Sequence, residues 1–519
     1  MMNVITIVFA ICFLACWLAV LRYDIQMFQQ NSYKPDRYLG WAKEHVLGHN
    51  RWLLMALMGL VWNKYLALVA AAVMLYYAYW EFKTKYKIKI VYTARVIRLY
   101  AAIMVIGLLL LFLVWRFLGP YAFFYAALLI LVLGKPMVLL GNLVNSPLEK
   151  AISKWYYKDA ARKLAKFPNL VIIGVTGSYG KTSTKNYLYR ILSEKYNTLI
   201  TPGNFNTTLG VVRTIREKLQ PFHQVFIVEM GAKQTGDIKE ICDLVHPSIG
   251  IVTSVGEMHL ETFKTLENIQ KTKFELIRSL PQDGLGIINA DSPGIASYKD
   301  LPTNCPLIKY GITSAPLDYR AESINYTPTG TDFTVVHSGV RSQMHTSLMG
   351  ECNVLDILAA VAVADRLGVS ESQQKTAVAK LQQVEHRLFI SQRGGLTILD
   401  DAYNSNPEGA RMALDVLRGL NLAEGATRIV VTPGFVELGK KQDDACRELG
   451  RRIAAAADKL IIVNKLNQKA IYKGAVEGGM HKGDITCAEN LAEAAAEIRR
   501  IAVPGDAILY ENDLPDTFK

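Results

Sequence analysis

The sequence predicts an α/β protein whose N-terminal part consists of transmembrane helices. Long apolar runs lie almost entirely before about residue 145. After residue 168, short runs rich in β-branched residues alternate with helix-like sequence, and the first of them leads into a glycine-rich turn. Such alternation predicts a mostly parallel sheet with helices on both faces. The chain has 519 residues, and since a typical domain has about 100–200 residues, we expect more than one domain.

The N-terminal part, residues 1–145, contains four apolar stretches, and crossing a bilayer takes about 20 helical residues. We therefore expect about four transmembrane helices. The last two stretches are separated by Gly119-Pro120, which predicts a hairpin of two spanning helices. The second is interrupted by Asn63 and Lys64 and could instead be a re-entrant or interfacial segment. The first could be a cleaved signal peptide, but it lacks a basic n-region and a small-residue cleavage site. The four stretches are 3–21, 52–80, 100–118 and 121–144.

Basic residues flank these apolar stretches. The formal net charge is +12, and much of it lies in two lysine-rich segments, 82–98 and 145–166. A hairpin places both segments on one side of the membrane, and the positive-inside rule makes that side the cytoplasm. We therefore expect a multi-pass membrane protein with a cytoplasmic soluble part and no nucleic-acid partner. The seven cysteines show no CxxC pair or zinc-like spacing, as in a reduced compartment.

The glycine-rich turn has the context of a phosphate-binding loop. The predicted strand 170–175 (LVIIGV) runs into 176–183 (TGSYGKTS), and helix-like sequence follows. In such a loop, backbone N–H groups and a helix N-terminus surround the phosphates. Lys181 would reach the outer phosphates, and Thr182 would ligate magnesium. The spacing is not that of a strict GxxxxGK[ST] loop, because Val175 stands where the first glycine belongs.

Three further predicted strands follow, and two of them lead to candidate ligands. In a parallel sheet, ligands bind beyond the carboxyl ends of the strands. Lys181, Glu229 and His259 all lie at or just past such ends, so we expect them to converge. Glu229 would be a magnesium ligand, although a solvated strand end is the alternative, and the sequence alone leaves the role of His259 open. The strands are 224–229, 249–254 and 284–289.

Several motifs after residue 168 resemble, in order, those of the Mur ligase family. The resemblance covers about residues 168–519, and the motifs are most similar to those of members that add D-alanyl-D-alanine to a UDP-muramoyl-tripeptide. The motifs are GVTGSYGKTS (174–183), TPGNFNTTLGVV (201–212), VEMGAKQTGDI (228–238), VTSVGEMHLETF (252–263), IQKTKFELI (269–277), GECN (350–353), EHRL (385–388), DDAYNSNPEGARMAL (400–414) and GFVELG (434–439).

The resemblance implies a domain organisation and a reaction. A basic cytoplasmic linker (146–167) would lead to a P-loop-type central ATPase domain (168–388) and a Rossmann-like C-terminal α/β domain (389–519). The enzyme would join a carboxylate acceptor to the amine of an amino acid or dipeptide through an acyl-phosphate. It would use ATP, two Mg²⁺ ions and a carbamylated lysine to build peptidoglycan precursors at a bacterial cell membrane.

The resemblance also implies residue roles. Glu229 would bind the first magnesium, while His259 and a carbamylated Lys273 would serve the second; Lys271 is a neighbouring alternative to Lys273. Asn353 would contact the adenine, and residues 387–406 would reach the nucleotide from across the domain junction. The implied catalytic residues are Lys181, Lys273, His259 and Asn404; the nucleotide-binding residues are Gly177, Gly180, Lys181, Thr182, Ser183, Asn353, Arg387, Asp401, Tyr403 and Asn406; the metal ligands are Thr182, Glu229, His259 and Lys273.

The sequence departs from the family in three places. Membrane helices occupy the stretch where the family carries its UDP-sugar-binding domain. Cys352 and His386 replace a usual His and Gly, and Glu511-Asn512-Asp513 is acidic where a basic loop is common. We therefore expect an acceptor that is lipid-linked or otherwise not a soluble UDP-sugar. The helices would contact membrane lipids, and whether they also bind substrate is open. A poly-glutamate-type ligase and a non-catalytic membrane scaffold are the alternative functions.

Overall fold

A computed structural model describes residues 2–45, 54, 64–86, 88–203, 205–327, 329–384, 387–402 and 406–514. The chain divides near Trp155 into two compact units. The first unit is helical, and the second contains two β-sheets with their helices. Each unit is described by itself.

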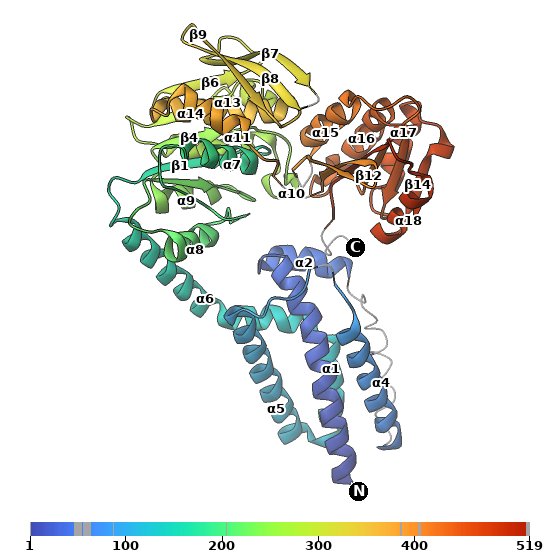
Figure 1. Ribbon diagram of the computed structural model, residues 1–519. Helices are drawn as coiled ribbons and strands as arrows, with labels where there is room; N and C mark the ends of the chain where they lie inside the picture. The colour runs from blue at the N-terminus through green and yellow to red at the C-terminus, as the bar shows by residue number, and fades with distance from the viewer. Residues whose placement is uncertain are drawn as a thin grey trace. The chain divides into compact units, whose positions relative to one another are not determined.

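The first unit is built from long apolar helices (Figure 1). Side chains such as Trp17 and Phe28 fill its core, while α5 exposes Leu108, Phe112 and Trp115. Exposed apolar side chains on long helices are typical of surfaces that face lipid. The helices are α1 (Met2–Gln30), α2 (Pro35–Glu44), α4 (Lys64–Lys83), α5 (Ala94–Val132) and α6 (Gly134–Leu164), of which α6 contributes to both units.

Two helices of the first unit are long and apolar enough to cross a membrane, Ile7–Gln30 and Ala94–Gly119. A third candidate span is the pair Ala122–Val132 and Gly134–Leu164, which is bent by 83°. The part of the chain that the structure describes thus offers two or three spans, not the four predicted. Most of the predicted stretch 52–80 before α4 lies outside the described residues.

The predicted stretch 121–144 is not a single unbroken helix, because the chain bends sharply at Leu133. Pro136 follows in the first turn of α6. A proline cannot donate the backbone hydrogen bond of a continuing helix, and it restricts the preceding residue, which favours a helix start here. The break predicted at Gly119 is present, since its φ of 85° and ψ of 178° are not helical. The segment 146–167, expected as a linker, is largely the second half of α6.

The larger sheet of the second unit has nine strands in the order β2-β3-β1-β4-β5-β6-β7-β8-β9. The strands from β2 to β7 pair in parallel, and β7, β8 and β9 pair in antiparallel fashion. The strands are β1 (Val171–Thr176), β2 (Thr198–Ile200), β3 (Val225–Glu229), β4 (Ile249–Val252), β5 (Leu285–Asn289), β6 (Leu307–Gly311), β7 (Tyr319–Thr327), β8 (Gly330–His337) and β9 (Val340–Thr346).

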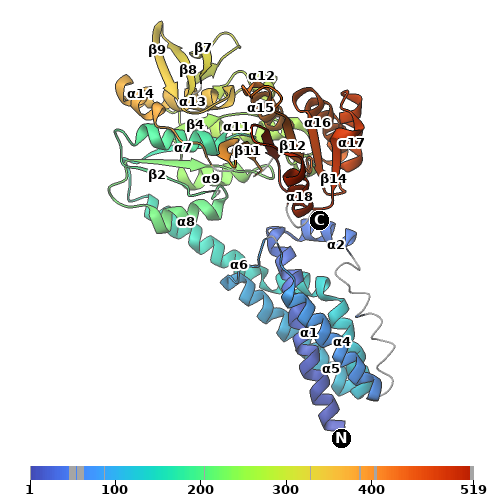
Figure 2. The ribbon, with the colours of Figure 1, turned by 45° about the vertical axis from the view of Figure 1, so that its right-hand side comes forward.

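Helices cover both faces of the parallel part of this sheet. Ile173 and Val175 of β1 pack with α7, α13 and α14, whereas Ile172 packs with α8, α9 and α11 on the opposite face. Figures 1 and 2 show α13 and α14 on one side of β1 and β4, and α8 on the other. The helices are α7 (Lys181–Leu192), α8 (Thr208–Lys218), α9 (Asp237–Val245), α10 (Leu260–Phe263), α11 (Leu266–Arg278), α12 (Pro293–Ala296), α13 (Glu351–Arg366) and α14 (Glu371–Ala379).

The smaller sheet has six strands in the order β10-β11-β15-β12-β13-β14. Five strands are parallel, and β10 at one edge is antiparallel to β11. The strands are β10 (Phe389–Arg393), β11 (Leu396–Asp401), β12 (Arg428–Thr432), β13 (Lys459–Val463), β14 (Ile485–Ala488) and β15 (Ala507–Glu511). The helices are α15 (Pro407–Gly419), η2 (Gly439–Lys441), α16 (Gln442–Ala456), α17 (Gln468–Glu477), η3 (Lys482–Asp484) and α18 (Leu491–Ile501).

Candidate active site

The glycine-rich turn joins β1, the third strand in the order of the larger sheet, to α7. β1 lies between β3 and β4. After β1 the chain forms β2 and β3 on one side of this strand, and then β4 on its other side. Such a switch point is where ligands bind in open α/β sheets. Gly180 is the N-cap of α7 with a φ of 80°, and a Cβ there would lie 2.6 Å from Asp356 Oδ1. A Cβ at Gly177 would lie 2.0 Å from Thr253 Oγ1, so both positions require glycine.

Hydrogen bonds fix this turn to the segment that follows β4. The N–H of Ser178 donates to Ser254 O at 2.9 Å, and the N–H of Tyr179 donates to Ser254 Oγ at 2.8 Å. The N–H of Gly256 donates to Ser178 Oγ at 2.9 Å. The turn is therefore held from outside in one conformation, which a preorganised phosphate site needs.

Lys181 begins α7 and folds back over the turn. Its Nζ donates to the carbonyl oxygens of Gly177 at 2.7 Å and Ser178 at 3.2 Å. Burial lowers the pKa of Lys181 to about 8, although the nearby Glu229 carboxylate acts to raise it. A cation held by two carbonyl oxygens can turn toward a phosphate without breaking an ion pair.

Glu229 at the end of β3 is the polar centre of the site. Its Oε1 accepts hydrogen bonds from Thr182 Oγ1 at 3.2 Å and Asn206 Nδ2 at 3.0 Å. Lys185 Nζ lies 3.0 Å from its Oε2. Burial acts to raise the pKa of Glu229, but Lys185 and Lys181 outweigh it and the pKa is lowered. The carboxylate is therefore ionised at neutral pH. Lys185 and Asn206 were not predicted from the sequence.

The residues at Glu229 fit one magnesium ion in a nucleotide complex. Mg²⁺ prefers oxygen ligands and usually combines one or two carboxylates with substrate phosphates. The Thr182 hydroxyl and the Glu229 carboxylate supply such oxygens from adjacent strand ends. Within the described ranges, no group of three or more His, Cys, Asp or Glu side chains could hold a metal by itself. The predicted second ion therefore has no complete protein site there.

His259 lies at the start of α10 with a φ of 51°. Its Nδ1 contacts a carboxylate oxygen of Glu437. Burial lowers the pKa of His259, although Glu437 acts to raise it, so the ring is neutral at neutral pH. A carboxylate on one ring nitrogen is also how proteins orient a metal-binding histidine. The N–H of Glu261 donates to Glu437 O at 3.2 Å, and Lys441 pairs with Glu257 at 2.6 Å.

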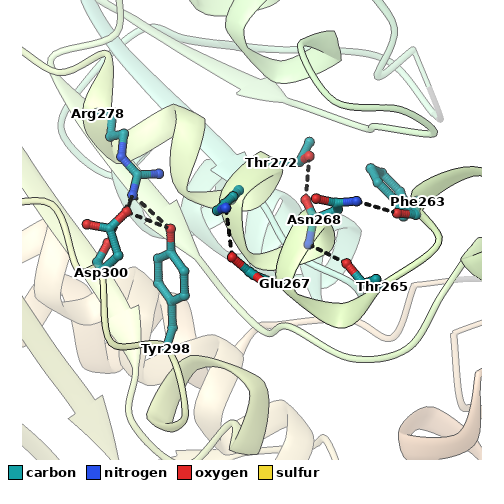
Figure 3. Close-up of polar contacts among 9 residues, drawn as sticks. Phe263, Thr265, Glu267, Asn268, Thr272, Arg278, Tyr298 and Asp300 are labelled. Atoms are coloured by element: carbon teal, nitrogen blue, oxygen red, sulfur yellow. Dashed lines mark hydrogen bonds and ion pairs between the residues drawn. The ribbon is translucent and has the colours of Figure 1, made fainter.

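The structure distinguishes Lys273 from Lys271, which both lie on α11. Lys271 lies on the exposed face and pairs with Glu267 at 2.7 Å. Figure 3 shows this polar face, with Thr265 Oγ1 capping the helix by accepting from the N–H of Asn268. Lys273 lies on the opposite, buried face and is 4% exposed. Burial, together with the positive charge of Lys181, lowers the pKa of Lys273 to about 7.

Helix α13 supports α7 through two polar contacts. On each helix, the two contacting residues are three positions apart. Asp356 Oδ1 accepts from Thr184 Oγ1 at 2.8 Å. Asn353 Oδ1 accepts from Tyr187 Oη at 2.6 Å, while Asn353 Nδ2 donates to Met349 O at 2.7 Å. Asn353, the predicted adenine contact, is 8% exposed and uses both amide atoms within the protein. Burial raises the pKa of Asp356 to about 8.

Comparison with known proteins identifies the family. Residues 175–364 match the Mur ligase middle domain, and residues 386–510 match the Mur ligase, glutamate ligase domain. The UDP-N-acetylmuramoyl-tripeptide–D-alanyl-D-alanine ligase of Mycobacterium tuberculosis is 33% identical over 367 residues, which are 66% of this chain and 70% of that protein. The chain belongs to the Mur ligase family.

A further sequence relative and two solved structures support the same family. The ligase of the same name from Escherichia coli is 30% identical over 332 residues, which cover 62% of this chain and 72% of that protein. The crystal structure of MurF from Acinetobacter baumannii has a TM-score of 0.63 at 27% identity and covers 70% of this chain and 77% of its own. MurF ligase from Thermotoga maritima, solved in complex with ADP, has a TM-score of 0.61 at 26% identity and covers 70% of this chain and 80% of its own.

The remaining predicted residues of this Mur ligase lie around β11 and α15. Asp401 ends β11, and its Oδ1 accepts from the N–H of Leu388 at 3.0 Å. Burial raises the pKa of Asp401 to about 6, while that N–H and the Arg387 charge act to lower it. Asn406 caps α15 by accepting from the N–H groups of Glu408 at 3.2 Å and Gly409 at 3.0 Å. Ser183 lies in the first turn of α7. The predicted residues Tyr403 and Asn404 lie outside the described residues.

Electrostatic influence links six of the predicted residues into one group. The pKa of Lys181 is influenced by Glu229, by Arg387 and, once it is ionised, by Asp356. The charge of Lys181 lowers the pKa of Lys273, and the charge of Lys273 acts to lower the pKa of His259. Arg387 in turn influences Asp401. Residues from α7, β3, α10, α11 and the start of the smaller sheet therefore lie near enough to influence one another's pKa.

Proposed function

We propose that this Mur ligase is an ATP-dependent enzyme that joins a carboxylate to an amine in the assembly of the peptidoglycan peptide stem. The observation that carries the proposal is the cluster of Lys181, Thr182 and Glu229 beside a fixed glycine-rich turn. We interpret that turn as a P-loop and the smaller sheet as a Rossmann-like domain. The relatives named for D-alanyl-D-alanine addition support an incoming dipeptide amine.

The reaction would proceed through an acyl-phosphate. An oxygen of the acceptor carboxylate attacks the γ-phosphorus of ATP, and the bond from that phosphorus to the bridging oxygen breaks to release ADP. The amine then attacks the acyl carbon, its proton leaves, and the carbon–oxygen bond to phosphate breaks. Phosphoryl transfer depends mainly on positioning and charge neutralisation. Lys181 would neutralise the outer phosphates, and Thr182 and Glu229 would hold magnesium, which screens the phosphate charge from the incoming carboxylate.

A carbamylated Lys273 would complete a place for a second magnesium ion beside His259. A neutral amine can add to CO₂, which gives a carbamate anion and releases a proton. The buried side chain of Lys273 supports this step, because a pKa of about 7 leaves much of the amine neutral at neutral pH. Carbamylation would thus replace the lysine cation with a carboxylate-like ligand. The neutral His259 ring would be the other protein ligand of the second magnesium ion.

The remaining predicted residues would bind the nucleotide. Gly177, Gly180 and Ser183 would surround the phosphates together with the N-terminus of α7. Arg387 and Asp401 would reach the nucleotide from across the domain junction. The other proposed nucleotide contacts are Asn353, Tyr403 and Asn406, and Asn404 would be a catalytic residue.

The N-terminal unit supports a membrane-associated form of this activity. We infer a transmembrane region at 1–145, a basic cytoplasmic segment at 146–167, and catalytic domains at 168–388 and 389–519. Exposed apolar side chains on α1, α4 and α5 would contact membrane lipids. The acceptor would be lipid-linked, because a membrane unit stands where the family carries the domain that grips the UDP-sugar.

The test is a substrate screen on the full-length protein in detergent, scored by phosphate release. The acceptors are UDP-muramoyl-tripeptide, its lipid-linked equivalent, and a poly-glutamate primer; the amines are D-alanyl-D-alanine and single amino acids. We expect release that needs Mg²⁺, prefers the lipid-linked acceptor with the dipeptide, and falls by about 100-fold or more in Lys181→Met. Equal activity on the soluble UDP-tripeptide would contradict the lipid-linked acceptor. Absence of release with every pair would contradict the enzyme assignment.

A further inference from the structure

Lys185 is a buried cation in the site that the proposed reaction does not use. It follows Lys181 by four residues on α7, so both side chains lie on one face of the helix. The Lys185 side chain is 1% exposed. A buried ammonium group is costly unless hydrogen bonds and an opposite charge compensate it.

Three oxygen atoms compensate the Lys185 charge. Nζ lies 3.0 Å from Glu229 Oε2, and it donates to Thr201 O at 3.0 Å and Gly203 O at 2.7 Å. Two of the three ammonium donors therefore make hydrogen bonds to carbonyl oxygens, and the Glu229 carboxylate balances the charge as an ion pair. Lys185 is therefore fixed, whereas the hydrogen bonds of Lys181 in the described part of the chain go to two carbonyl oxygens of its own turn.

The contact with Lys185 divides the two oxygens of Glu229 between different tasks. Oε2 faces Lys185, while Oε1 faces Thr182 and Asn206. We infer that Lys185 is a positioning residue, which turns Oε1 of Glu229 toward magnesium beside the Thr182 hydroxyl. This inference rests on the proposed magnesium role of Glu229.

The same lysine connects the nucleotide site to the chain that follows β2. Lys185 binds the carbonyl groups of Thr201 and Gly203, and the Thr201 hydroxyl accepts from the N–H of Glu229 at 3.1 Å. Asn206, a few residues later, donates to Glu229 Oε1. Lys185 and Glu229 thus hold this stretch from both sides, so that loss of the lysine would release the carboxylate and its neighbours together.

A purely electrostatic role for Lys185 predicts the opposite effect on magnesium. A cation next to Glu229 reduces the negative charge that Mg²⁺ meets, so its removal would tighten magnesium binding if charge alone mattered. If Lys185 positions the carboxylate, its removal weakens magnesium binding. Partners that orient metal ligands typically change metal affinity by about 10- to 100-fold when they are mutated.

The experiment measures the Mg²⁺ dependence of nucleotide binding to the full-length protein in detergent. A fluorescent ATP analogue is titrated at increasing Mg²⁺ and in EDTA, with wild type, Lys185→Met, Lys185→Arg and Lys195→Met. Lys195 is the matched control, because it also donates to two carbonyl groups, Leu367 O and Gly368 O, but is exposed and away from Glu229.

We expect Lys185→Met to raise the Mg²⁺ concentration for half-maximal binding by about tenfold or more, with nearly unchanged binding in EDTA. Lys185→Arg should raise it by about threefold, because a planar guanidinium keeps the charge but not the geometry. Lys195→Met should match wild type. An unchanged or lower Mg²⁺ requirement in folded Lys185→Met would overturn the inference. If Lys185→Met does not fold, an unchanged requirement in Lys185→Arg would overturn it. Wild type without any Mg²⁺ dependence would instead contradict the proposed function.

Discussion

The Asp356 carboxyl on α13 accepts a 2.8 Å hydrogen bond from the Thr184 hydroxyl on α7. It also occupies the space beside Gly180 that a Cβ would take. The conformation of the glycine-rich turn therefore depends on a residue far away in the sequence. Burial raises the pKa of this carboxyl to about 8, so it is mostly protonated at neutral pH.

Asp356→Asn should stabilise the protein relative to wild type as pH rises. The folded protein holds the Asp356 proton up to a pH of about 8, whereas the unfolded chain loses it at about pH 4. Wild type therefore loses stability between these two values, and the amide does not. Thermal unfolding from pH 5 to 9 should show a gap between the two proteins that widens up to about pH 8 and then stays constant. A gap that is independent of pH would contradict an uncharged Asp356.

Gly180→Ala should damage nucleotide binding more than Gly236→Ala. Both glycines are helix N-caps in the left-handed region, with φ of 80° and 91°. A side chain costs about 1–2 kcal/mol at either position because of the backbone conformation alone. Only at Gly180 would the new Cβ also meet Asp356, at 2.6 Å, since nothing lies within 4 Å of it at Gly236. Thermal unfolding and nucleotide titration measure both effects, and equal losses would mean that the Asp356 contact is unimportant.

Lys273→Ala should remove activity that depends on CO₂. The neutral fraction of the Lys273 amine increases through a pH of about 7, and only that form can become a carbamate. Wild type stripped of CO₂ should lose phosphate release and regain it with bicarbonate, faster at pH 8 than at pH 6. A short carboxylic acid should partly rescue Lys273→Ala by supplying the missing carboxylate. Lys271→Ala is the control, because Lys271 is exposed and paired with Glu267. Bicarbonate-independent activity would argue against carbamylation.

The sequence was sufficient to predict the strands that have a clear local pattern and the site residues that stand at their ends. The predicted strand 224–229 corresponds to β3, Val225–Glu229, and its last residue lies beside Thr182. Lys185 could have been suspected from its four-residue spacing after Lys181. Its pairing with Glu229, however, requires that β3 lies next to β1, which local sequence does not reveal.

Other features depended on tertiary structure in the same way. The contact of His259 with Glu437 joins residues 178 positions apart. The bend at Leu133 was missed although Gly134 and Pro136 follow it, because the span was predicted from length and hydropathy, which do not register a change of direction. Asp356 was missed because a single acidic residue in an apolar helix gives no sign of the glycine it supports.

Glu437→Ala should weaken the site at His259, whereas Lys441→Met should not. Glu437 holds the Nδ1 side of the imidazole, and Lys441 forms an exposed pair with Glu257. Removing a carboxylate that orients a metal-binding histidine typically costs about 10- to 100-fold in metal affinity or activity, while an exposed ion pair contributes about 0–1 kcal/mol. Phosphate release at limiting and saturating Mg²⁺ separates metal affinity from turnover. Equal losses in both variants would mean that these contacts only tie residues 257–261 to 437–441, and that Glu437 has no separate effect on the histidine.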